Sequence, residues 1–299
     1  MLYAATVLMA TYNGEKFLNQ QLESLSLQVG VKLSIYALDA GSTDQTISIL
    51  QKWIDRGLSL SYQISEGSNP SNSFMTLLQE RKGDNFIFFA DQDDLWNQNK
   101  CLTMIEKHLE TKSDVIICQR SIIDEQGNSK AGQTSKKLIP SWNNALVENI
   151  AYGNCTLITS KFAKFVSTTS LPEDFLYDSW IYLLASLQKS ISGVNSIQVS
   201  YRIHSGNAIG VSGKIELLRK YRAWNRFSNQ VLYIKAIHLN ELTENEKRFF
   251  LAYRYCFEKF SLLNLVKVSL WNPALRQNRF ESTLFRLVFP ILVILFWIN

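Results

Sequence analysis

Three carboxylates stand within the four-residue run Asp91–Asp94, which reads Asp-Gln-Asp-Asp and directly follows the apolar run Phe86–Ala90. A short apolar run is typical of a strand buried on both faces, so the carboxylates are expected at the end of that strand. Clustered carboxylates raise one another's pKa values unless a cation lies among them. Their oxygen atoms suit Mg²⁺ or Mn²⁺, which can also bind a diphosphate. The alternative is an acidic turn that caps a helix beginning near Asn99.

Two further polar loops follow apolar runs in the same way. Asp39–Asp44 follows Leu33–Leu38, and Ala10–Gly14 follows Tyr3–Met9. In Asp39–Asp44, Gly41 permits a tight backbone path, and Ser42 or Asp44 can cap the next helix. Because parallel strands end at one edge of a sheet, the three loops are expected side by side, with helix N-termini that can face phosphates.

The scaffold that must position these loops is readable from the alternation of apolar and amphipathic runs. The strands expected to be buried on both faces are Tyr3–Met9, Leu33–Leu38, Leu60–Ile64, Phe86–Ala90 and Val115–Cys118. Helical spacing of apolar residues occupies Phe17–Leu25, Ile47–Ile54, Met75–Leu78 and Leu102–Leu109, and one amphipathic helix is expected around Trp180–Leu187. Such alternation predicts an α/β fold, a Rossmann-like, mostly parallel sheet with helices on both faces.

The chain divides into two parts by charge and periodicity. We expect residues 1–211 to form the catalytic domain and residues 212–299 to form a helical C-terminal region, because apolar residues recur at helical spacing from Leu217 onward. From Lys214 to the end there are 14 Lys and Arg against 6 Asp and Glu, a charge of +8, so the net charge of +5 leaves −3 on the rest. A basic end on an acidic body suits nucleic acid or anionic lipid.

The end of the chain favours lipid. Leu287–Ile298 is 12 apolar residues, shorter than the about 20 that a spanning helix needs, and Pro290 would disturb a regular helix. Basic and aromatic residues accompany it: Arg276, Arg279, Arg286, Trp271 and Trp297. This pattern predicts a helix lying in the membrane interface, at the inner face of the cell membrane. The alternative is a helix docked on the protein's own core or on a second subunit of a homodimer.

The cysteines and the first residues indicate the cytosol. Cys101, Cys118, Cys155 and Cys256 lie far apart without CxxC pairs, which predicts buried thiols and neither a zinc site nor a disulfide scaffold. The apolar stretch Met1–Ala10 lacks a basic start and a small-residue cleavage site, so a first buried strand is expected there instead of a signal peptide.

Five stretches, in order, resemble the family 2 glycosyltransferases: Val7–Gly14, Leu38–Asp44, Phe89–Trp96, Tyr177–Ala185 and Tyr201–Gly210. The Asp-Gln-Asp-Asp-x-Trp and Tyr-Arg-x-His-x-x-Asn patterns look most like the bacterial rhamnosyltransferase branch. The resemblance covers residue 1 to about 210. It implies a GT-A fold and metal-dependent, inverting transfer of a sugar. It also implies dTDP-rhamnose as donor and a lipid-linked oligosaccharide, a precursor of capsule or cell-wall polysaccharide, as acceptor.

The resemblance also implies roles for individual residues. Asp178 matches the general base, and Asp91, Asp93 and His204 match the ligands of Mn²⁺ or Mg²⁺. The residues expected to bind the donor are Thr11, Tyr12, Asn13, Asp39, Gly41, Ser42, Asp91, Gln92 and Arg202. Aromatic neighbours of Asp178 would desolvate it and raise its pKa, which makes it a better base. Alternatively, Asp178 is a helix N-cap and His204 a structural histidine.

One departure from the family pattern concerns the nucleotide. Family members usually carry two adjacent Asp residues where this chain has Asp39 and Ala40, and the second commonly helps to read the base. The resemblance therefore leaves the base open, and glucose or galactose from a UDP donor is an alternative to rhamnose.

The same residues fit three other classes of function less well. A nucleotidyltransferase would want a basic, Gly-rich first loop, and no basic residue precedes Lys16. Because Ala40 replaces a family carboxylate, the chain is also compatible with a non-catalytic nucleotide-sugar-binding partner of another transferase. The presence of Asp178, which matches the general base, favours a catalytic protein instead. Nucleic-acid binding is disfavoured, because the body is acidic and the basic residues mix with an apolar tail.

Overall fold

A computed structural model gives the fold of residues 2–205, with 66, 68, 81–84, 130–136, 146–147 and 172–174 left out. Beyond residue 205 it describes only residues 244, 247–248, 251, 263, 266–268 and 290. The expected C-terminal helices, Cys256 and the segment Leu287–Ile298, apart from Pro290, therefore lie outside the described residues.

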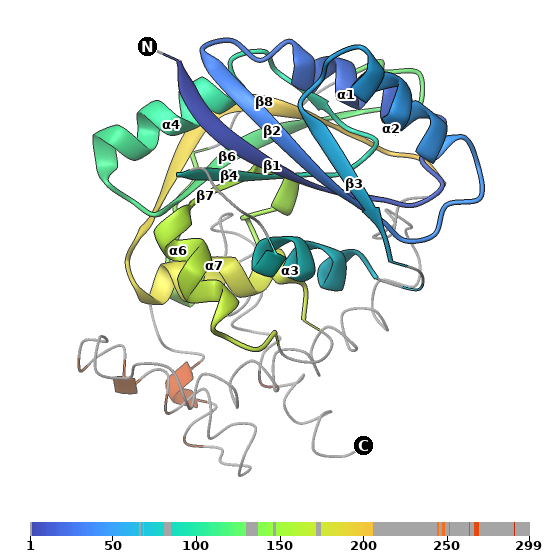
Figure 1. The fold of residues 1–299 in the computed structure, drawn as a ribbon. Helices are drawn as coiled ribbons and strands as arrows, with labels where there is room; N and C mark the ends of the chain where they lie inside the picture. The colour runs from blue at the N-terminus through green and yellow to red at the C-terminus, as the bar shows by residue number, and fades with distance from the viewer. Residues whose placement is uncertain are drawn as a thin grey trace.

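Strands and helices alternate along the described chain (Figure 1). The first half contains β1 (Tyr3–Thr11), α1 (Leu18–Ser26), β2 (Val31–Asp39), α2 (Thr46–Asp55), β3 (Leu60–Ile64), α3 (Pro70–Glu80), β4 (Phe86–Ala90) and β5 (Leu95–Trp96). The second half contains α4 (Lys100–Thr111), β6 (Val115–Ile123), α5 (Trp142–Ala145), the 3₁₀ turn η1 (Gly153–Cys155), β7 (Thr156–Thr159), α6 (Ser160–Ser167), α7 (Tyr177–Leu187) and β8 (Ile191–Arg202).

The described strands form one sheet in the order β3-β2-β1-β4-β7-β6-β8-β5. Neighbours β3-β2, β2-β1, β1-β4 and β6-β8 are parallel, whereas β7 is antiparallel to β4 and β6, and β5 is antiparallel to β8. Strands β1, β2, β4, β6 and β8 consequently end at the same edge, and η1 leads into β7 there. We call this the carboxyl edge of the sheet.

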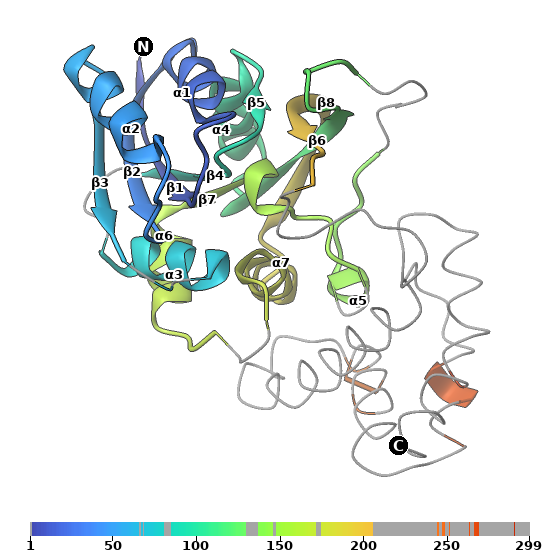
Figure 2. The ribbon, with the colours of Figure 1, turned by 90° about the vertical axis from the view of Figure 1, so that its right-hand side faces the viewer.

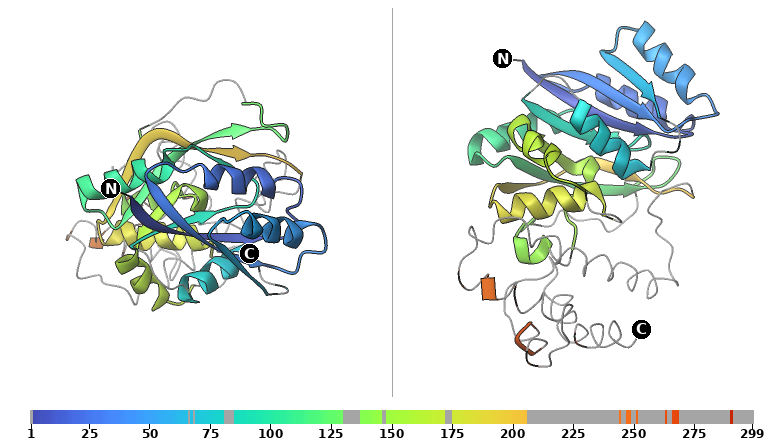
Figure 3. Two further views of the ribbon diagram at one scale, coloured as in Figure 1. Left: turned by 45° about the horizontal axis from the view of Figure 1, so that its top comes forward. Right: turned by 60° about the horizontal axis from the view of Figure 1, so that its bottom comes forward.

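Helices cover both faces of the sheet, as the α/β prediction requires (Figures 1 and 2). Leu22 of α1, Leu50 of α2 and Met104 of α4 pack in the core on one face. Phe74 of α3 and Leu183 of α7 belong to the core on the other face. Figure 3 shows the same two helical layers from two further sides. All five residues are at most 1 % exposed, so burial of these apolar stripes holds the layers together.

Local sequence explains the most regular elements. Every side chain of β4 is buried, in agreement with an unbroken apolar run in a central strand. Helix α6 begins where the Thr159 hydroxyl accepts the N–H of Phe162 (3.2 Å), an N-cap bond. The expected strands are all present, and β1, β2 and β6 are longer than their apolar cores predicted.

Three expectations about burial were wrong. Strand β3 is not buried on both faces, because it lies at the sheet edge and only Leu60 is buried. The helix α7 is not amphipathic, since nine of its eleven residues are buried between α3, α5 and the sheet. Leu109 of α4 is 40 % exposed, and Cys101, Met104 and Ile105 carry the buried stripe in its place.

The cysteines that the structure describes agree with the sequence. Cys101, Cys118 and Cys155 are buried free thiols. Among the helices drawn from the described residues, none combines the length and apolarity needed to cross a membrane.

Candidate active site

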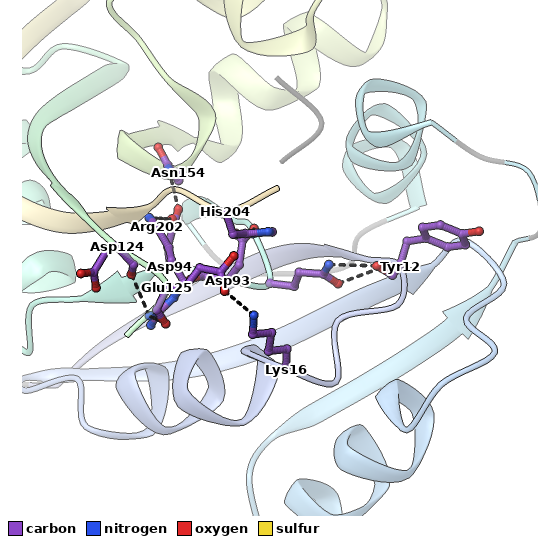
Figure 4. Close-up of polar contacts among 10 residues, drawn as sticks. Tyr12, Lys16, Asp93, Asp94, Asp124, Glu125, Asn154, Arg202 and His204 are labelled. Atoms are coloured by element: carbon purple, nitrogen blue, oxygen red, sulfur yellow. Dashed lines mark hydrogen bonds and ion pairs between the residues drawn. The ribbon is translucent and has the colours of Figure 1, made fainter. Parts of the chain in front are cut away.

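The loops after β1, β2 and β4 meet at the carboxyl edge, and side chains tie them together. The Gln92 amide bonds the backbone of Tyr12 twice, with Tyr12 N–H donating to Gln92 Oε1 (2.8 Å) and Gln92 Nε2 donating to the Tyr12 carbonyl (2.9 Å) (Figure 4). A Cβ on Gly14 would clash with that amide. Gln92 was expected to bind the donor, but the oxygen and the nitrogen of its amide are both hydrogen-bonded to Tyr12. Gln92 therefore joins the first loop to the third.

Asp39 organises the second loop from a fully buried position. Its carboxylate accepts hydrogen bonds from the Thr11 hydroxyl (2.8 Å), the Ser42 hydroxyl (2.6 Å) and the N–H groups of Gly41 (3.0 Å) and Ser42 (2.7 Å). Gly41 has a φ of +89°, which suits glycine at this turn. The structure thus brings Thr11, Asp39, Gly41 and Ser42 together, as expected, and occupies both Asp39 oxygens with protein donors.

Asn13 and Tyr12 complete the first loop. Asn13 donates its N–H to the Ser42 hydroxyl (2.8 Å) and accepts the N–H of Thr43 at Oδ1 (3.0 Å). Tyr12 is 57 % exposed, so among these loop residues it offers a large open surface. Asp44 accepts the N–H of Thr46 in the first turn of α2 (2.9 Å), but the N-cap residue is Gln45, whose side chain forms no capping bond, so the expected cap from this loop was wrong.

The third carboxylate of the acidic run, Asp94, is structural. It is fully buried and accepts the N–H of Arg202 (3.1 Å) and the side-chain amide of Asn154. Burial and the neighbouring charge of Asp93 raise the pKa of Asp94 to about 7. The alternative that this run caps α4 was wrong, because the N-cap residue is Asn99 and no side chain forms a capping bond there.

Asp93 and His204 come together although they lie 111 residues apart in the sequence (Figure 4). Asp93 Oδ2 lies 2.7 Å from His204 Nε2, and both side chains are about nine-tenths buried, at 12 % and 13 % exposed. The His204 ring packs on Phe17, with ring centroids 4.7 Å apart. Both residues were expected as ligands of one cation, and the structure brings their side chains together in a partly buried contact between a carboxylate and an imidazole.

These residues fit a divalent cation only in part. Within the described part of the chain, no three His, Cys, Asp or Glu side chains are arranged to hold a metal ion. Asp93 and His204 offer one oxygen and one nitrogen ligand, and such sites take their remaining ligands from substrate phosphates and water. Burial and then the charges of Asp94 and Asp93 hold the pKa of Asp91 well above its usual range, so a cation nearby would relieve a real electrostatic cost.

Arg202, expected to bind the donor phosphates, is 1 % exposed. Its guanidinium donates to the carbonyls of Asp93 (2.9 Å), Asp124 (3.3 Å) and Glu125 (2.9 Å) (Figure 4). It also donates to the Gln20 side chain (2.7 Å). These donors are directed at protein acceptors. The geometry therefore favours a positioning role, in which Arg202 holds the backbone of Asp93 in place.

Asp178 lies in the first turn of α7, at the same edge. Its carboxylate accepts the N–H of Ser179 at Oδ1 (2.6 Å) and the N–H of Gly153 at Oδ2 (3.2 Å). The N-cap of α7 is Leu176, so the alternative that Asp178 is the N-cap was wrong. Burial raises the pKa of Asp178 against the effect of these hydrogen bonds, as is useful in a general base.

The turn η1 connects Asp178 to the acidic run. Gly153 bonds Asp178, and Asn154 bonds Asp94 through its side chain. The Asn154 carbonyl accepts the buried ammonium of Lys100 (2.7 Å), and burial lowers the pKa of Lys100 to about 8. The charge of Asp178 helps to raise the pKa of Asp91, so Asp178 and the acidic run form one electrostatic unit.

Sequence reasoning missed Gly153, Asn154, Lys100 and Arg120, all at or beside this unit. A weak signal was available for Lys100, a charged residue at the start of a helix whose next turn carries buried Cys101, Met104 and Ile105. Asn154 and Gly153 lie in a stretch without periodicity, and their roles arise from contacts between segments distant in sequence.

Comparisons with known proteins point in one direction. The sequence model described as "Glycosyl transferase family 2" matches residues 6–164, more than half of the chain. The dTDP-rhamnosyl transferase RfbG of Shigella flexneri is 32% identical over 108 residues, which are 33% of this chain and 36% of RfbG. WfgD of Escherichia coli, a UDP-Glc:alpha-D-GlcNAc-diphosphoundecaprenol beta-1,3-glucosyltransferase, is 24% identical over 222 residues, 73% of this chain and 84% of WfgD.

TarS of Staphylococcus aureus is similar in sequence and in structure. The poly(ribitol-phosphate) beta-N-acetylglucosaminyltransferase TarS is 28% identical over 128 residues, 41% of this chain and 22% of TarS. The crystal structure of TarS 1–349 with UDP-GlcNAc superposes with a TM-score of 0.61 at 20% identity, over 90% of this chain and 79% of that one. The chain thus spans about a third of RfbG and less of full-length TarS.

Proposed function

The chain belongs to glycosyl transferase family 2, and we propose that it transfers a hexosyl unit from a nucleotide sugar to a bacterial glycan acceptor with inversion at the anomeric carbon. The observation that carries the proposal is the meeting of the Asp93–His204 contact and Asp178 at one edge of the sheet. Asp93 and His204 can stabilise the leaving diphosphate, and Asp178 can accept the proton of the attacking hydroxyl.

The proposed reaction is a single in-line displacement. Asp178 accepts the proton of the acceptor hydroxyl while the acceptor oxygen forms a bond to the anomeric carbon. The bond from that carbon to the diphosphate oxygen breaks on the opposite side, and the nucleoside diphosphate leaves with the electron pair. Hydrogen bonds from Gly153 and Ser179 hold the Asp178 carboxylate in a fixed orientation, which is the positioning that such catalysis needs.

We place Mn²⁺ or Mg²⁺ at Asp93 and His204, with Asp91 near it. The ion would supply positive charge against the diphosphate of the donor. The chain's own residues prepare that position, since Arg202 fixes the backbone of Asp93 and Phe17 supports the His204 ring.

For the donor we propose dTDP-rhamnose, which the name of RfbG supports over a third of the chain. A UDP-hexose is the second candidate, because WfgD is named for UDP-Glc and TarS was crystallised with UDP-GlcNAc. Ala40, which removes a family carboxylate beside Asp39, keeps the base open. Exposed Tyr12 and the loops organised by Asp39, Asn13 and Ser42 would border the nucleoside.

For the acceptor we propose a sugar linked through diphosphate to a lipid, as in the name of WfgD. A protein with such an acceptor would work in the cytoplasm at the inner face of the membrane, and Leu287–Ile298 with its preceding arginines would provide the attachment. Deleting residues 287–299 should weaken membrane recovery and leave the catalytic domain folded. Aggregation or unfolding of the truncated protein would instead assign the segment to the core or to a dimer interface.

A panel of nucleotide sugars with Mn²⁺ tests the function. Hydrolysis, transfer and thermal stabilisation by dTDP-rhamnose, UDP-glucose, UDP-galactose and UDP-N-acetylglucosamine should single out one donor. Stabilisation without turnover by any donor, with a diphosphate-lipid acceptor present, would favour a non-catalytic binding partner. Neither stabilisation nor turnover across the panel would sink the proposal.

A further inference from the structure

Arg120 of β6 lies beside the candidate site with its guanidinium between two tyrosine rings. Its guanidinium carbon is 3.5 Å from the ring centroid of Tyr152 and 4.2 Å from that of Tyr201. Cation–π contacts on two rings restrain the plane of the group without using its N–H donors. The stack therefore presents a partly buried, oriented edge of donors.

The donors of Arg120 contrast with those of Arg202. Arg202 donates to carbonyls and to Gln20, whereas no hydrogen bond or ion pair joins Arg120 to another residue in the described part of the chain. A planar guanidinium fork matches phosphate geometry in a bidentate manner. Of these two buried or half-buried arginines near the carboxylates, Arg120 is the one whose donors are open to a ligand.

Arg120 lies close to the acidic run, since its positive charge opposes the raised pKa values of Asp91 and Asp94, and it also contacts the turn that holds the general base. Tyr152, which covers one face of the guanidinium, directly precedes Gly153, whose N–H holds Asp178. The donor diphosphate is placed at Asp93 and His204. The acceptor hydroxyl must reach Asp178, so a ligand beside Tyr152 belongs to the acceptor.

We propose that Arg120, clamped between Tyr152 and Tyr201, binds a phosphate of the acceptor. The inference rests on the proposed function and narrows it. Because Arg120 and Asp178 flank the same short turn, the phosphate must stand next to the sugar that carries the reacting hydroxyl. The acceptor is then a sugar attached directly to a diphosphate lipid or a polymer with a phosphate in each unit. A long neutral oligosaccharide would not reach both groups.

The test compares two acceptors on each variant. One is N-acetylglucosaminyl diphosphate carrying an alkyl chain, and the other is the alkyl N-acetylglucosaminide that lacks the diphosphate. Calorimetric affinities of both, and the acceptor KM where turnover is found, are measured for the wild-type protein and for Arg120→Gln, Arg120→Lys and Arg56→Gln. Arg56 is the matched control, because it also stacks on an aromatic ring, Trp53 (5.3 Å), away from the carboxyl edge.

The wild-type protein and Arg56→Gln should bind the diphosphate acceptor about 10-fold or more tightly than the neutral acceptor. The neutral acceptor has no phosphate to accept a charge-assisted hydrogen bond from Arg120. Arg120→Gln should reduce that ratio to near 1, and Arg120→Lys should keep part of it. Because the ratio is taken within one variant, a general loss of stability does not change it. An unchanged ratio in Arg120→Gln would overturn the inference.

A drop in donor affinity with an intact acceptor ratio would also overturn it, by moving Arg120 to the donor site. The binding ratio can be measured without turnover. A ratio that depends on Arg120 in a protein that turns over no nucleotide sugar would therefore support the phosphate site while removing the transferase proposal.

Discussion

Two partly buried carboxylates, one at each end of the parallel strands, have pKa values shifted in opposite directions. At the edge opposite to the site, Asp114 precedes β6 and accepts hydrogen bonds from Thr159 (2.8 Å), Ser190 (3.1 Å) and Lys161 (3.2 Å). Burial raises the pKa of Asp114, yet these bonds outweigh it and leave the pKa lowered. At the carboxyl edge, burial outweighs the hydrogen bonds of Asp178 and leaves its pKa raised.

The difference separates a carboxylate kept for stability from one kept for chemistry. Asp114 has a cationic partner and hydroxyl donors, so its ionised form is favoured in the folded protein. For Asp178, burial outweighs the hydrogen bonds that Ser179, Gly153 and Asn149 donate, so its pKa is raised and its ionised form is disfavoured in the folded protein. Perturbed groups of this kind cluster at functional sites. The following experiments challenge this contrast, from the largest expected effect to the smallest.

Removal of divalent cations should abolish transfer. The carboxyl edge concentrates the carboxylates of Asp91, Asp93 and Asp94, and among the described residues no ion pair joins them to a lysine or an arginine. After chelation and metal stripping, Mn²⁺ or Mg²⁺ should restore the rate measured with a nucleotide sugar. Full activity in the metal-stripped protein would exclude a divalent cation from the transfer reaction.

Gly153→Ala should lose both activity and stability. A Cβ at this position would clash with the Tyr177 hydroxyl, and the displaced N–H would release Asp178. Overpacking costs about 1–3 kcal/mol of the free energy of unfolding, and a 1 Å displacement near reacting groups can cost about 10²-fold in rate.

Gly193→Ala is the matched control, since its Cβ would lie 2.8 Å from Leu138 Cβ, outside the turn that bonds Asp178. It should lose stability while the rate per folded molecule stays normal. Equal rate losses in the two variants would show that η1 has no special part in the site.

The pH dependence of stability should have opposite signs for the two carboxylates. Asp114 has a lowered folded pKa, so its stabilisation is present above the unfolded value of about 3.9 and is lost as pH falls through the folded pKa. Asp114→Asn should therefore cost about 1–3 kcal/mol at pH 7 and progressively less below about pH 4.

Asp178 has a raised folded pKa, so its contribution to stability is greatest below the unfolded pKa and declines as pH rises through the folded pKa. Relative to the wild-type protein, Asp178→Asn should gain stability as the pH rises from about 4, the unfolded pKa, through the raised folded pKa. Denaturant unfolding across that range measures both variants. Parallel pH profiles would break the contrast between the edges.

The sequence predicted the parts of this picture that depend on local pattern. The unbroken apolar run of β4 located the acidic loop, and the alternation of runs located the α/β layers. The resemblance pointed to Asp93 and His204 as ligands of one cation, and the structure brings the two side chains into contact. The antiparallel insertion of β7 was not predictable, because a four-residue strand carries little periodic signal.

The supporting contacts were out of reach for another reason. Arg202 reaches backbone carbonyls after β4 and β6, and such acceptors exist at every residue, so residue type alone does not reveal them. The exposure of β3 likewise follows from its place at the end of the strand order, which no single strand sequence encodes.

The central claim is that Asp178 serves the chemical step and not donor binding, and one paired measurement tests it. Transfer rate and calorimetric donor affinity are compared for Asp178→Asn, with Asp114→Asn as the control from the other edge. Asp178→Asn keeps the size of the side chain and cannot accept a proton at neutral pH. The account predicts a rate loss of about 10²–10⁴-fold with donor affinity within a few-fold of normal. A near-normal rate, or a loss of donor binding, would contradict it.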